Sequence, residues 1–266
     1  MSAATPPYTA LSLELDGPVA VVTLQRPERM NALSRVLLQE IGTVFRALAA
    51  DPAVRAVVLT GSGEKAFCAG ADLKERQGMT EDDVRALLGL YRESFGAVDA
   101  CPKPVVAAIQ GVALGGGFEL ALACDLRVAS AGAVVGLPET SLAIIPGAGG
   151  TQRLPRLVGP GRAKEMILLA RRYAAHEALS LGLVTALAAP GETALAAAKR
   201  LVAPLASGAP IALAAAMEAV DGGADLDLAE GMLLEARCYE KTLVSSDRRE
   251  ALAAFSEGRK PVYRGE

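Results

Sequence analysis

Two glutamates lie in otherwise apolar stretches of this 266-residue sequence. Glu119 lies in ALGGGFELALACD (113–125), and Glu139 lies in VVGLPETSLAIIPGAGG (134–150). Burial in apolar surroundings raises the pKa of a carboxyl group toward neutrality, where it suits proton transfer. Each glutamate has a structural alternative, since Glu119 can interact with a helix dipole and the Pro138-Glu139 pair can begin a helix. Two such carboxyl groups on one chain favour a paired acid/base site.

Three consecutive glycines, Gly115 to Gly117, follow a predicted buried strand and begin a helical pattern. Glycine permits backbone angles that other residues resist, and it lets a ligand approach the main chain closely. Backbone N–H groups at a helix start favour an anion or a carbonyl oxygen that gains negative charge. The alternative is a tight turn that only allows close packing. Neither GxGxxG nor the Walker sequence GxxxxGKS/T occurs, so the turn does not predict a nucleotide site.

A second loop of similar character is KAFCAGADLKER (65–76), which follows a buried strand and leads into a helix. Ligands of open α/β sheets gather at the carboxyl ends of strands, and this loop and the glycine turn both lie at such ends. Each can present a backbone N–H group to one oxygen atom, although their spacing leaves open whether they converge.

The composition argues against metal and nucleic-acid chemistry. The chain has one histidine, His176, and four cysteines without a CxxC pair, so we expect no metal site and reduced thiols. No histidine lies near Cys68 in the sequence to activate it as a nucleophile, so we expect the cysteines to pack in the core. The 27 Lys and Arg against 30 Asp and Glu residues give a net charge of −3, which offers no basis for binding nucleic acid.

The order of predicted elements indicates an α/β architecture. Ser34 is a suitable N-cap for a helix, and the apolar runs near residues 55 and 105 are typical of strands buried on both faces. The sequence ββαβαβ favours parallel strands joined by right-handed crossovers. The expected strands are at about 11–15, 19–24, 55–61 and 105–109, and the expected helices are at about 35–50 and 81–99.

The last part of the chain has a different character. Beyond about residue 190 four segments show helical spacing, so we divide the chain into an α/β core (1–195) and a helical region (196–266) that covers the core or makes subunit contacts. The apolar stretch 104–129 is interrupted by Gln110, Glu119 and Asp125, which indicates a buried segment and not a membrane span. The N-terminus lacks a signal-peptide pattern, and we expect a cytoplasmic protein.

Three long segments resemble the enoyl-CoA hydratase/isomerase (crotonase) family in the expected order, and the similarity extends from about Leu11 to Glu266. The resemblance implies a spiral of ββα units followed by a C-terminal helical region that mediates trimer formation. It also implies an acyl-CoA substrate, no cofactor other than the coenzyme A of that substrate, and a homotrimer or a homohexamer made of two trimers. The segments are AFCAGADLKER (66–76), ALGGGFELALACDLRVA (113–129) and LPETSLAIIPGAGGTQRLPR (137–156).

The resemblance assigns roles to particular residues. The family's oxyanion hole falls on the backbone N–H groups of Ala71 and Gly116, which would hold the thioester carbonyl. The two hydratase glutamates fall on Glu119 and Glu139. Glu139 would supply the proton at C2, and Glu119 would orient and activate the water that adds at C3.

The resemblance also implies the contacts with coenzyme A. The loop around Ala69, Asp72 and Leu73 would bind its adenine and pantetheine parts. Hydratases of the family often have a lysine near the C-terminus where a neighbouring subunit reaches the coenzyme. This chain has a glycine there, and Arg259 or Lys260 is the candidate replacement.

Within the family, the chain resembles methylglutaconyl-CoA hydratases in particular. This implies the reversible syn-addition of water to 3-methylglutaconyl-CoA, in the leucine/isovalerate pathway. Lys74 or Arg76 would receive the distal carboxylate, unless both are ordinary exposed helix residues. A general short-chain hydratase, an isomerase and a C–C lyase are the alternatives. An animal member of this subgroup binds RNA through a lysine-rich helix, whereas the equivalent helix here has only Arg35 and Arg46, so RNA binding is disfavoured.

Overall fold

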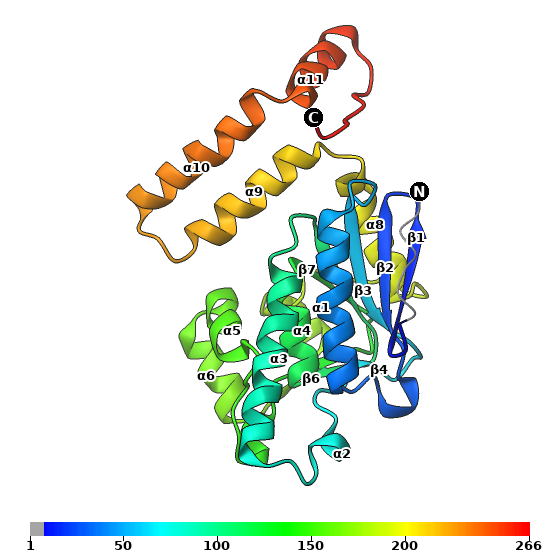
Figure 1. The fold of residues 1–266 in the computed structure, drawn as a ribbon, viewed down its shortest axis with the longest axis vertical. Coiled ribbons are helices and arrows are strands. Elements are labelled where there is room, and N and C mark those ends of the chain that lie inside the picture. Colours follow the sequence, from blue (N-terminus) through cyan, green and yellow to red (C-terminus); the bar gives the residue numbers. More distant parts are fainter. Residues whose placement is uncertain (1–7) are drawn as a thin grey trace.

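The computed structural model describes residues 8–266, which form two β-sheets flanked by helices (Figure 1). The larger sheet has the order β1-β2-β3-β5-β7-β10, in which β1 and β2 are antiparallel and the other neighbours are parallel. The four expected strands are confirmed, while the first seven residues of the expected core and N-terminus lie outside the described residues. The strands of this sheet are β1 (Leu11–Asp16), β2 (Val19–Leu24), β3 (Ala56–Gly61), β5 (Val105–Ile109), β7 (Leu126–Ala129) and β10 (Ala186–Leu187).

The smaller sheet was not expected from the sequence. It has the order β4-β6-β8-β9, with β8 and β9 antiparallel and the other pairs parallel. Strands of three residues are too short to show a clear period of two, and β4 lies within the segment that the sequence predicts as a loop. The strands are β4 (Ala66–Cys68), β6 (Val112–Leu114), β8 (Val134–Gly136) and β9 (Arg172–Ala174).

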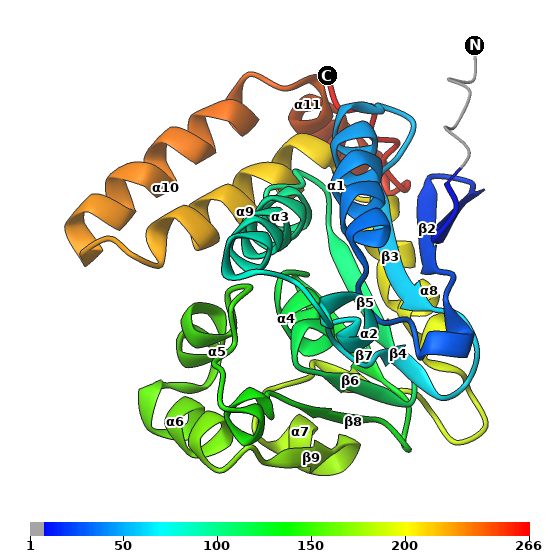
Figure 2. The ribbon, with the colours of Figure 1, turned by 60° about the horizontal axis from the view of Figure 1, so that its bottom comes forward.

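Helices cover both faces of the larger sheet and continue beyond it (Figures 1 and 2). The two helices expected in the core are confirmed, and Ser34 caps the first by accepting a hydrogen bond from the N–H of Leu37 at 3.2 Å. The helices are α1 (Arg35–Ala50), α2 (Leu73–Arg76), α3 (Glu81–Asp99), α4 (Gly116–Leu122), α5 (Gly150–Val158), α6 (Pro160–Leu168), α7 (Ala175–Ser180), α8 (Ala194–Ala206), α9 (Pro210–Gly223), α10 (Leu228–Leu243) and α11 (Ser246–Glu257), with the 3₁₀ turns η1 (Pro27–Arg29) and η2 (Glu139–Leu142).

The central strands β3 and β5 are buried along their whole length, as their apolar runs predict. Val57 and Leu59 point to one face of the sheet, where they share a cluster with apolar side chains of α1 and α3. Ala56 and Val58 point to the other face and pack with α8. Two layers of helix therefore keep water away from the sheet, which removes much apolar surface from solvent.

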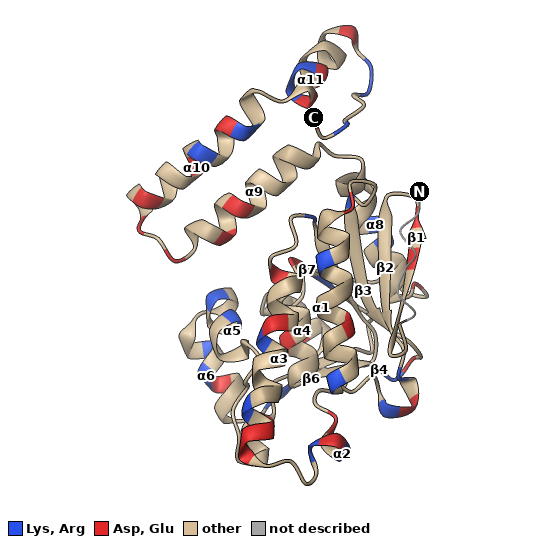
Figure 3. Cartoon of the chain, viewed as in Figure 1, with Lys and Arg blue, Asp and Glu red and all other residues tan. Residues whose placement is uncertain are grey.

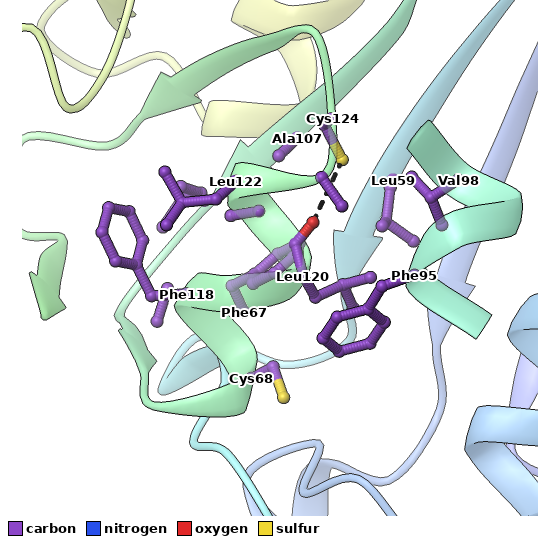
Figure 4. Close-up of a cluster of buried hydrophobic side chains, with 14 of the residues drawn as sticks. Leu59, Phe67, Cys68, Phe95, Val98, Ala107, Phe118, Leu120, Leu122 and Cys124 are labelled. Atoms are coloured by element: carbon purple, nitrogen blue, oxygen red, sulfur yellow. Dashed lines mark hydrogen bonds between the residues drawn. The ribbon is translucent and has the colours of Figure 1, made fainter. Parts of the chain in front are cut away.

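The short helix α4 is held in place by its buried apolar side chains. Leu120 lies in one buried cluster with Phe67 and Phe95 (Figure 4), and Phe118 is buried as well. Phe67 belongs to β4, so this packing joins α4 to the strand that precedes the loop at 69–72. The N-terminal end of α4 is consequently fixed against that loop.

The C-terminal helices α9 and α10 lie side by side and extend away from the core, with α11 beyond them (Figures 1 and 2). The expected boundary at residues 195/196 falls inside α8, which packs on β3 and β5. No single helix in the part of the chain that the structure describes is long and apolar enough to cross a membrane; α8 and α9 reach that length only as a pair bent by 109°. The apolar stretch at 104–129 folds into β5, β6, α4 and β7 of the core.

Both cations of α1 form ion pairs with carboxylates of α3. Figure 3 shows where charged residues lie along the chain. Arg35 lies 3.8 Å from Asp83, and Arg46 lies 3.3 Å from Glu93. Both pairs are exposed, so their contribution to stability is small. They do not form the cluster of unpaired positive charge that phosphate binding requires.

Candidate active site

The loop after β4 and the glycine turn after β6 lie side by side, because β4 and β6 are parallel neighbours. The N–H nitrogen of Ala71 lies 3.9 Å from the position that a Cβ atom on Gly116 would take. Gly116 begins α4, where the first N–H groups have no partner within the helix. No acceptor for the N–H of Ala71 or Gly116 is found among residues 8–266. The two loops therefore converge, and both amides are available to one oxygen atom.

The glycines of the turn are required for different reasons. Gly115 has a φ of +53°, in the left-handed region that side chains disfavour. A Cβ atom on Gly116 would lie 3.1 Å from Cδ1 of Leu33, and a Cβ atom on Gly117 would collide with the carbonyl oxygen of Cys68. A side chain at Gly117 does not fit beside β4, and one at Gly115 would strain the backbone, so packing and conformation account for these two glycines.

Glu119 is buried beside this turn and is held by backbone N–H groups. The residue is 3% exposed, and its Oε1 accepts hydrogen bonds from the N–H of Ala148 at 2.8 Å and of Gly150 at 2.7 Å. Burial raises the pKa of Glu119 above its ordinary value, and the two N–H groups counteract part of this increase. The same two donors fix the orientation of the carboxylate.

Glu139 is the second carboxyl group of the site, and its surroundings differ. It is 8% exposed, and its Oε2 has no hydrogen-bond partner within the described part of the chain. Its Oε1 lies 3.1 Å from the position of a Cβ atom on Gly115, so the group borders the glycine turn. Burial, followed by the charge of Glu119, raises the pKa of Glu139 to about 7. Such a group exists in both protonation states near neutrality and can donate a proton.

The two glutamates and the residues of the two amides line one cavity of about 870 Å³. An oxygen atom placed at the two amides would gain stabilisation for developing negative charge. Carbon atoms of the same molecule would then lie within reach of the two carboxyl groups, which can transfer protons. Of the residues predicted from the sequence, those that line the cavity are Ala69, Ala71, Leu73, Arg76, Gly116, Glu119 and Glu139.

Comparison with known proteins shows which family the chain is similar to. The family model described as enoyl-CoA hydratase/isomerase matches residues 14–266. The chain belongs to the enoyl-CoA hydratase/isomerase family. The enoyl-CoA isomerase/hydratase fer4 of Mycosarcoma maydis is 46% identical over 263 residues, covering 96% of this chain and 95% of the relative. The short-chain-enoyl-CoA hydratase of Clostridium acetobutylicum is 42% identical over 248 residues, covering 93% of this chain and 95% of the relative.

The fold agrees with that of solved members of the family. The crystal structure of an enoyl-CoA hydratase from Bacillus anthracis superimposes with a TM-score of 0.94 at 46% identity, covering 97% of this chain and 100% of that chain. The expected crotonase-like α/β fold with a C-terminal helical region is therefore confirmed.

In this member of the enoyl-CoA hydratase/isomerase family, the residues predicted to bind coenzyme A line two different cavities. Ala69 and Leu73 line the 870 Å³ cavity, whereas Asp72 pairs with Arg26 at 2.8 Å and lines a neighbouring cavity of about 490 Å³. Burial opposes ionisation of Asp72, but the hydrogen bond from Arg26 and two backbone N–H groups lower its pKa overall. Lys74 is exposed and lies outside both linings. The contact of Asp72 with coenzyme A stays a prediction.

Several residues that line the cavity were not identified from the sequence. Tyr91 packs against Gly116, and its side chain carries a hydroxyl 3.5 Å from the carbonyl oxygen of Leu33. Arg92 and Arg172 line the cavity as well. The helical spacing of Tyr91 indicates only a core position, and arginines are mostly solvated surface residues, so no local signal distinguishes these residues.

The cysteines are packing residues in this fold. All four are buried and free. Burial raises the pKa of the Cys68 thiol to about 12, so it is a thiol and not a nucleophilic thiolate at neutral pH. Among residues 8–266, no group of three His, Cys, Asp or Glu side chains is arranged to hold a metal ion.

Proposed function

We propose that this protein catalyses the reversible syn-addition of water across the 2,3 double bond of a 2-enoyl-CoA thioester. The observation that carries the proposal is that Glu119 and Glu139 line the same cavity as the amides of Ala71 and Gly116. A relative that covers most of the chain has the name short-chain-enoyl-CoA hydratase. The reaction needs no metal or redox cofactor, since coenzyme A arrives as part of the substrate.

The two amides act on the thioester carbonyl. Its oxygen accepts hydrogen bonds from the N–H groups of Ala71 and Gly116, which have no internal acceptor in the described chain. Negative charge develops on this oxygen as the water oxygen attacks C3, and fixed donors stabilise that charge without reorganising. Loss of one such donor in comparable sites costs about 2.7–4 kcal/mol of transition-state stabilisation, so the amides are a principal source of catalysis.

The two glutamates divide the proton transfers. Glu119, oriented by two N–H groups, positions and activates the water, and its hydroxyl adds at C3. Glu139, whose pKa is about 7, transfers its proton to C2. The proton that the water loses passes to the carboxyl pair and replaces the one given to C2. The pair therefore ends with as many protons as it had at the start. Both groups line one cavity, and syn addition requires that they act from the same side of the double bond.

A hydration assay tests this proposal directly. Loss of the absorbance of the conjugated enoyl thioester is followed with crotonyl-CoA, 3-methylglutaconyl-CoA and 3-methylcrotonyl-CoA. We expect turnover of at least one substrate by the wild type, and we expect Glu119→Gln and Glu139→Gln each to lower kcat by roughly a hundredfold or more. A wild-type enzyme that hydrates none of the three would overturn the assignment.

Isomerisation and C–C cleavage are the alternatives within the family, and the name of the fer4 relative includes isomerase. Both alternatives use amides that stabilise an enolate, so the amides do not discriminate between them. The presence of a second carboxyl group that can hold a water molecule favours hydration. Incubation with a 3-enoyl-CoA distinguishes an isomerase from a hydratase. An isomerase forms the conjugated thioester, whereas a hydratase without isomerase activity leaves this substrate unchanged.

For the acyl group, we propose 3-methylglutaconyl-CoA, of the leucine/isovalerate pathway, with Arg76 as the contact for its distal carboxylate. Arg76 lines the cavity, and no carboxylate within residues 8–266 forms an ion pair with it. A carboxylate in the cavity would provide the missing partner, and a guanidinium can bind it with two hydrogen bonds. Lys74, the other candidate, is exposed and outside the lining, which favours Arg76.

We propose further that the chain forms a homotrimer, alone or paired into a hexamer, through its C-terminal helices. Phe255 is 89% exposed, and large apolar side chains are exposed along the same helices. Large apolar side chains exposed on successive helices, and at Val244 between α10 and α11, favour an interaction site there. Analytical ultracentrifugation that finds a monomer at micromolar concentration would contradict this. The exposed apolar residues are Val220, Leu228, Met232, Leu233, Tyr239, Val244, Leu252 and Phe255.

Between the two candidates for the C-terminal coenzyme contact, the ion pairs favour Lys260. Arg259 is held by Glu250 at 2.6 Å and by Glu257 at 2.6 Å within the same chain. No ion pair of Lys260 is found in the described residues. Lys260→Ala is therefore expected to raise KM for the acyl-CoA more than Arg259→Ala does.

A further inference from the structure

The segment that precedes α1 runs alongside the loop that contains Ala71. Leu33 and Ala71 form an isolated parallel β-bridge. The N–H of Leu33 donates to the carbonyl oxygen of Gly70 at 2.8 Å, and the N–H of Asp72 donates to the carbonyl oxygen of Leu33 at 3.1 Å. Leu33 therefore bonds through both of its backbone groups to the two residues that flank Ala71, and through neither of them to Ala71 itself.

This pairing sets the direction in which Ala71 donates. In a parallel pair, a residue bonds to the neighbours of the residue opposite it, whose own N–H and C=O groups point to the other edge of the chain. The other edge of this loop faces the glycine turn, since a Cβ atom on Gly70 would lie 2.9 Å from the carbonyl oxygen of Leu114. The bridge to Leu33 thus directs the N–H of Ala71 toward the turn that provides the second amide.

The side chain of Leu33 reaches that second amide. Its Cδ1 lies 3.1 Å from the position that a Cβ atom on Gly116 would take, and Cε1 of Tyr91 lies 3.4 Å from the same position. Leu33 is 1% exposed and Tyr91 is 4% exposed, so the packing around them leaves neither side chain free to move. The first residue of α4 consequently rests on Leu33.

Further contacts hold the segment of Leu33 in place. Arg26 donates to the carbonyl oxygen of Ala32 and, at 2.8 Å, to the carboxylate of Asp72. One guanidinium therefore joins the residue before Leu33 to a residue that bonds to Leu33. Ser34, the residue that follows, caps α1. Leu33 is thus fixed from both sides along the chain.

Leu33 itself is not among the described residues that line the 870 Å³ cavity, so it acts on a ligand only through other groups. We propose that Leu33 is a positioning residue that fixes the Ala71 and Gly116 amides relative to one another. Its backbone holds one amide and its side chain supports the other. The inference rests on the proposed function, in which both amides hold the thioester carbonyl. A displacement on the order of 1 Å at such a site lowers the rate about a hundredfold.

Leu33→Ala tests the side-chain contact while it keeps the bridge. We expect kcat for crotonyl-CoA to fall about tenfold to a hundredfold and KM to change by less than about threefold, because the amides act mainly on charge that develops in the transition state. Leu33→Met conserves volume and should keep kcat within about threefold of wild type. Leu38→Ala is the matched control, since Leu38 is 0% exposed in the same core cluster and is not among the atoms nearest Gly116. It should lower the Tm by a similar amount without the loss of kcat.

The bridge is tested separately by replacing Leu33 with its α-hydroxy analogue, which converts one backbone amide to an ester and keeps the side chain. The ester cannot donate to Gly70, so we expect kcat to fall about tenfold. The same replacement at Leu38 removes the hydrogen bond from its N–H to the carbonyl oxygen of Ser34 at 3.0 Å, which lies within α1 and its cap. That control should keep kcat within about threefold of wild type.

Binding of butyryl-CoA, isotopically labelled at the thioester carbonyl, gives a readout that does not depend on catalysis. Hydrogen bonds from the two amides lower the stretching frequency of this carbonyl, which infrared difference spectroscopy measures. We expect the lowered band in wild type and in Leu38→Ala. In Leu33→Ala and in the Leu33 ester, we expect a band closer to that of free butyryl-CoA.

The outcomes separate this inference from the proposed function. If the wild type hydrates no enoyl-CoA, the proposed function fails, but a carbonyl band that shifts in Leu33→Ala and not in Leu38→Ala still supports the role of Leu33. Wild-type kcat and an unchanged band in both Leu33→Ala and the Leu33 ester overturn the inference. Equal losses in Leu38→Ala and Leu33→Ala overturn it too, because the effect would then come from a general loss of packing. If Leu33→Ala does not fold, the ester and its control decide by the same criteria.

A wild-type band equal to that of free butyryl-CoA also overturns the inference, since the amides would then not hold the carbonyl.

Discussion

Glu119 lies directly against Gly150, whose N–H donates to its Oε1 at 2.7 Å. A Cβ atom on Gly150 would lie 2.9 Å from the same oxygen, closer than real Cβ atoms come to a neighbour. The residue that holds the carboxylate is thus also one that cannot carry a side chain without moving it. Gly150 is far from Glu119 in the sequence, but it fixes the position of the carboxylate that holds the water.

Gly150→Ala is expected to lower kcat for hydration by roughly tenfold to a hundredfold, because a displaced carboxylate no longer aligns the water. The added methyl group would also meet Leu137 and Pro146 at 2.9 Å each, so it has no free direction in which to move. Gly161→Ala is the matched control, since nothing lies within 4 Å of its Cβ position. Stopped-flow or steady-state kinetics measure kcat for both variants, and circular dichroism checks that they fold. A wild-type kcat in Gly150→Ala would contradict the prediction.

The rate of hydration should fall as the pH rises above about 7. Burial raises the pKa of Glu139 to about 7, so the proton that it gives to C2 is present below this pH and is lost above it. Dehydration starts from the same carboxyl pair holding one proton, and the equilibrium constant of a reaction that takes up no net proton does not depend on pH, so kcat/KM for dehydration should fall over the same range. Measurement of kcat/KM in both directions from pH 5.5 to 9 tests this. Profiles that are flat across this range in both directions would exclude Glu139 as the proton donor.

Glu139→Gln should stabilise the folded protein at pH 8 while it inactivates the enzyme. Because the pKa of Glu139 is raised from 4.5 to about 7 in the folded state, the folded chain holds this proton more tightly than the unfolded chain does. The corresponding stability is present below pH 4.5 and is lost as the pH rises through 7. Glutamine has no proton to lose.

We therefore expect the variant to have a Tm about 2–4 °C above wild type at pH 8, with most of the difference gone at pH 5. Thermal unfolding followed by calorimetry at the two pH values measures it. Glu14→Gln, at an exposed position on β1, serves as the control and should show no such pH-dependent gain. An equal change in Tm at both pH values would mean that the effect does not come from titration of Glu139.

Arg76→Ala should lower kcat/KM for 3-methylglutaconyl-CoA at least tenfold more than for crotonyl-CoA, because only the first substrate has a carboxylate to pair with the guanidinium. Lys74→Ala, two residues away and outside the cavity, should affect both substrates equally. Parallel kinetics with the two substrates provide the comparison. An equal loss of kcat/KM for the two substrates in Arg76→Ala would show that Arg76 does not bind the carboxylate. The assignment as a general short-chain hydratase would then be favoured.

The individual chemical groups of the site were predictable from local sequence. Glu119 and Glu139 stand out as carboxylates within apolar runs, and burial follows from those runs because apolar side chains are driven from water. The glycine turn was likewise recognisable, since a left-handed φ such as that of Gly115 favours glycine. The strands β3 and β5 follow from their continuous apolar runs, and the helices α1 and α3 follow from the spacing of their apolar residues.

What the tertiary structure decided is which of these groups meet. The convergence of Ala71 and Gly116 depends on the pairing of β4 with β6, two strands of three residues whose own sequences are too short to indicate strand structure. The separation of Asp72 from the main cavity depends on Arg26, which is 46 residues away in the chain. The pairing of Leu33 with Ala71 joins two loops, and no strand pattern in the sequence indicates it. Sequence patterns report whether a residue is buried and in which kind of element, because that depends on its neighbours in the chain. Distances between elements depend on packing among residues far apart in sequence, and only the folded structure contains them.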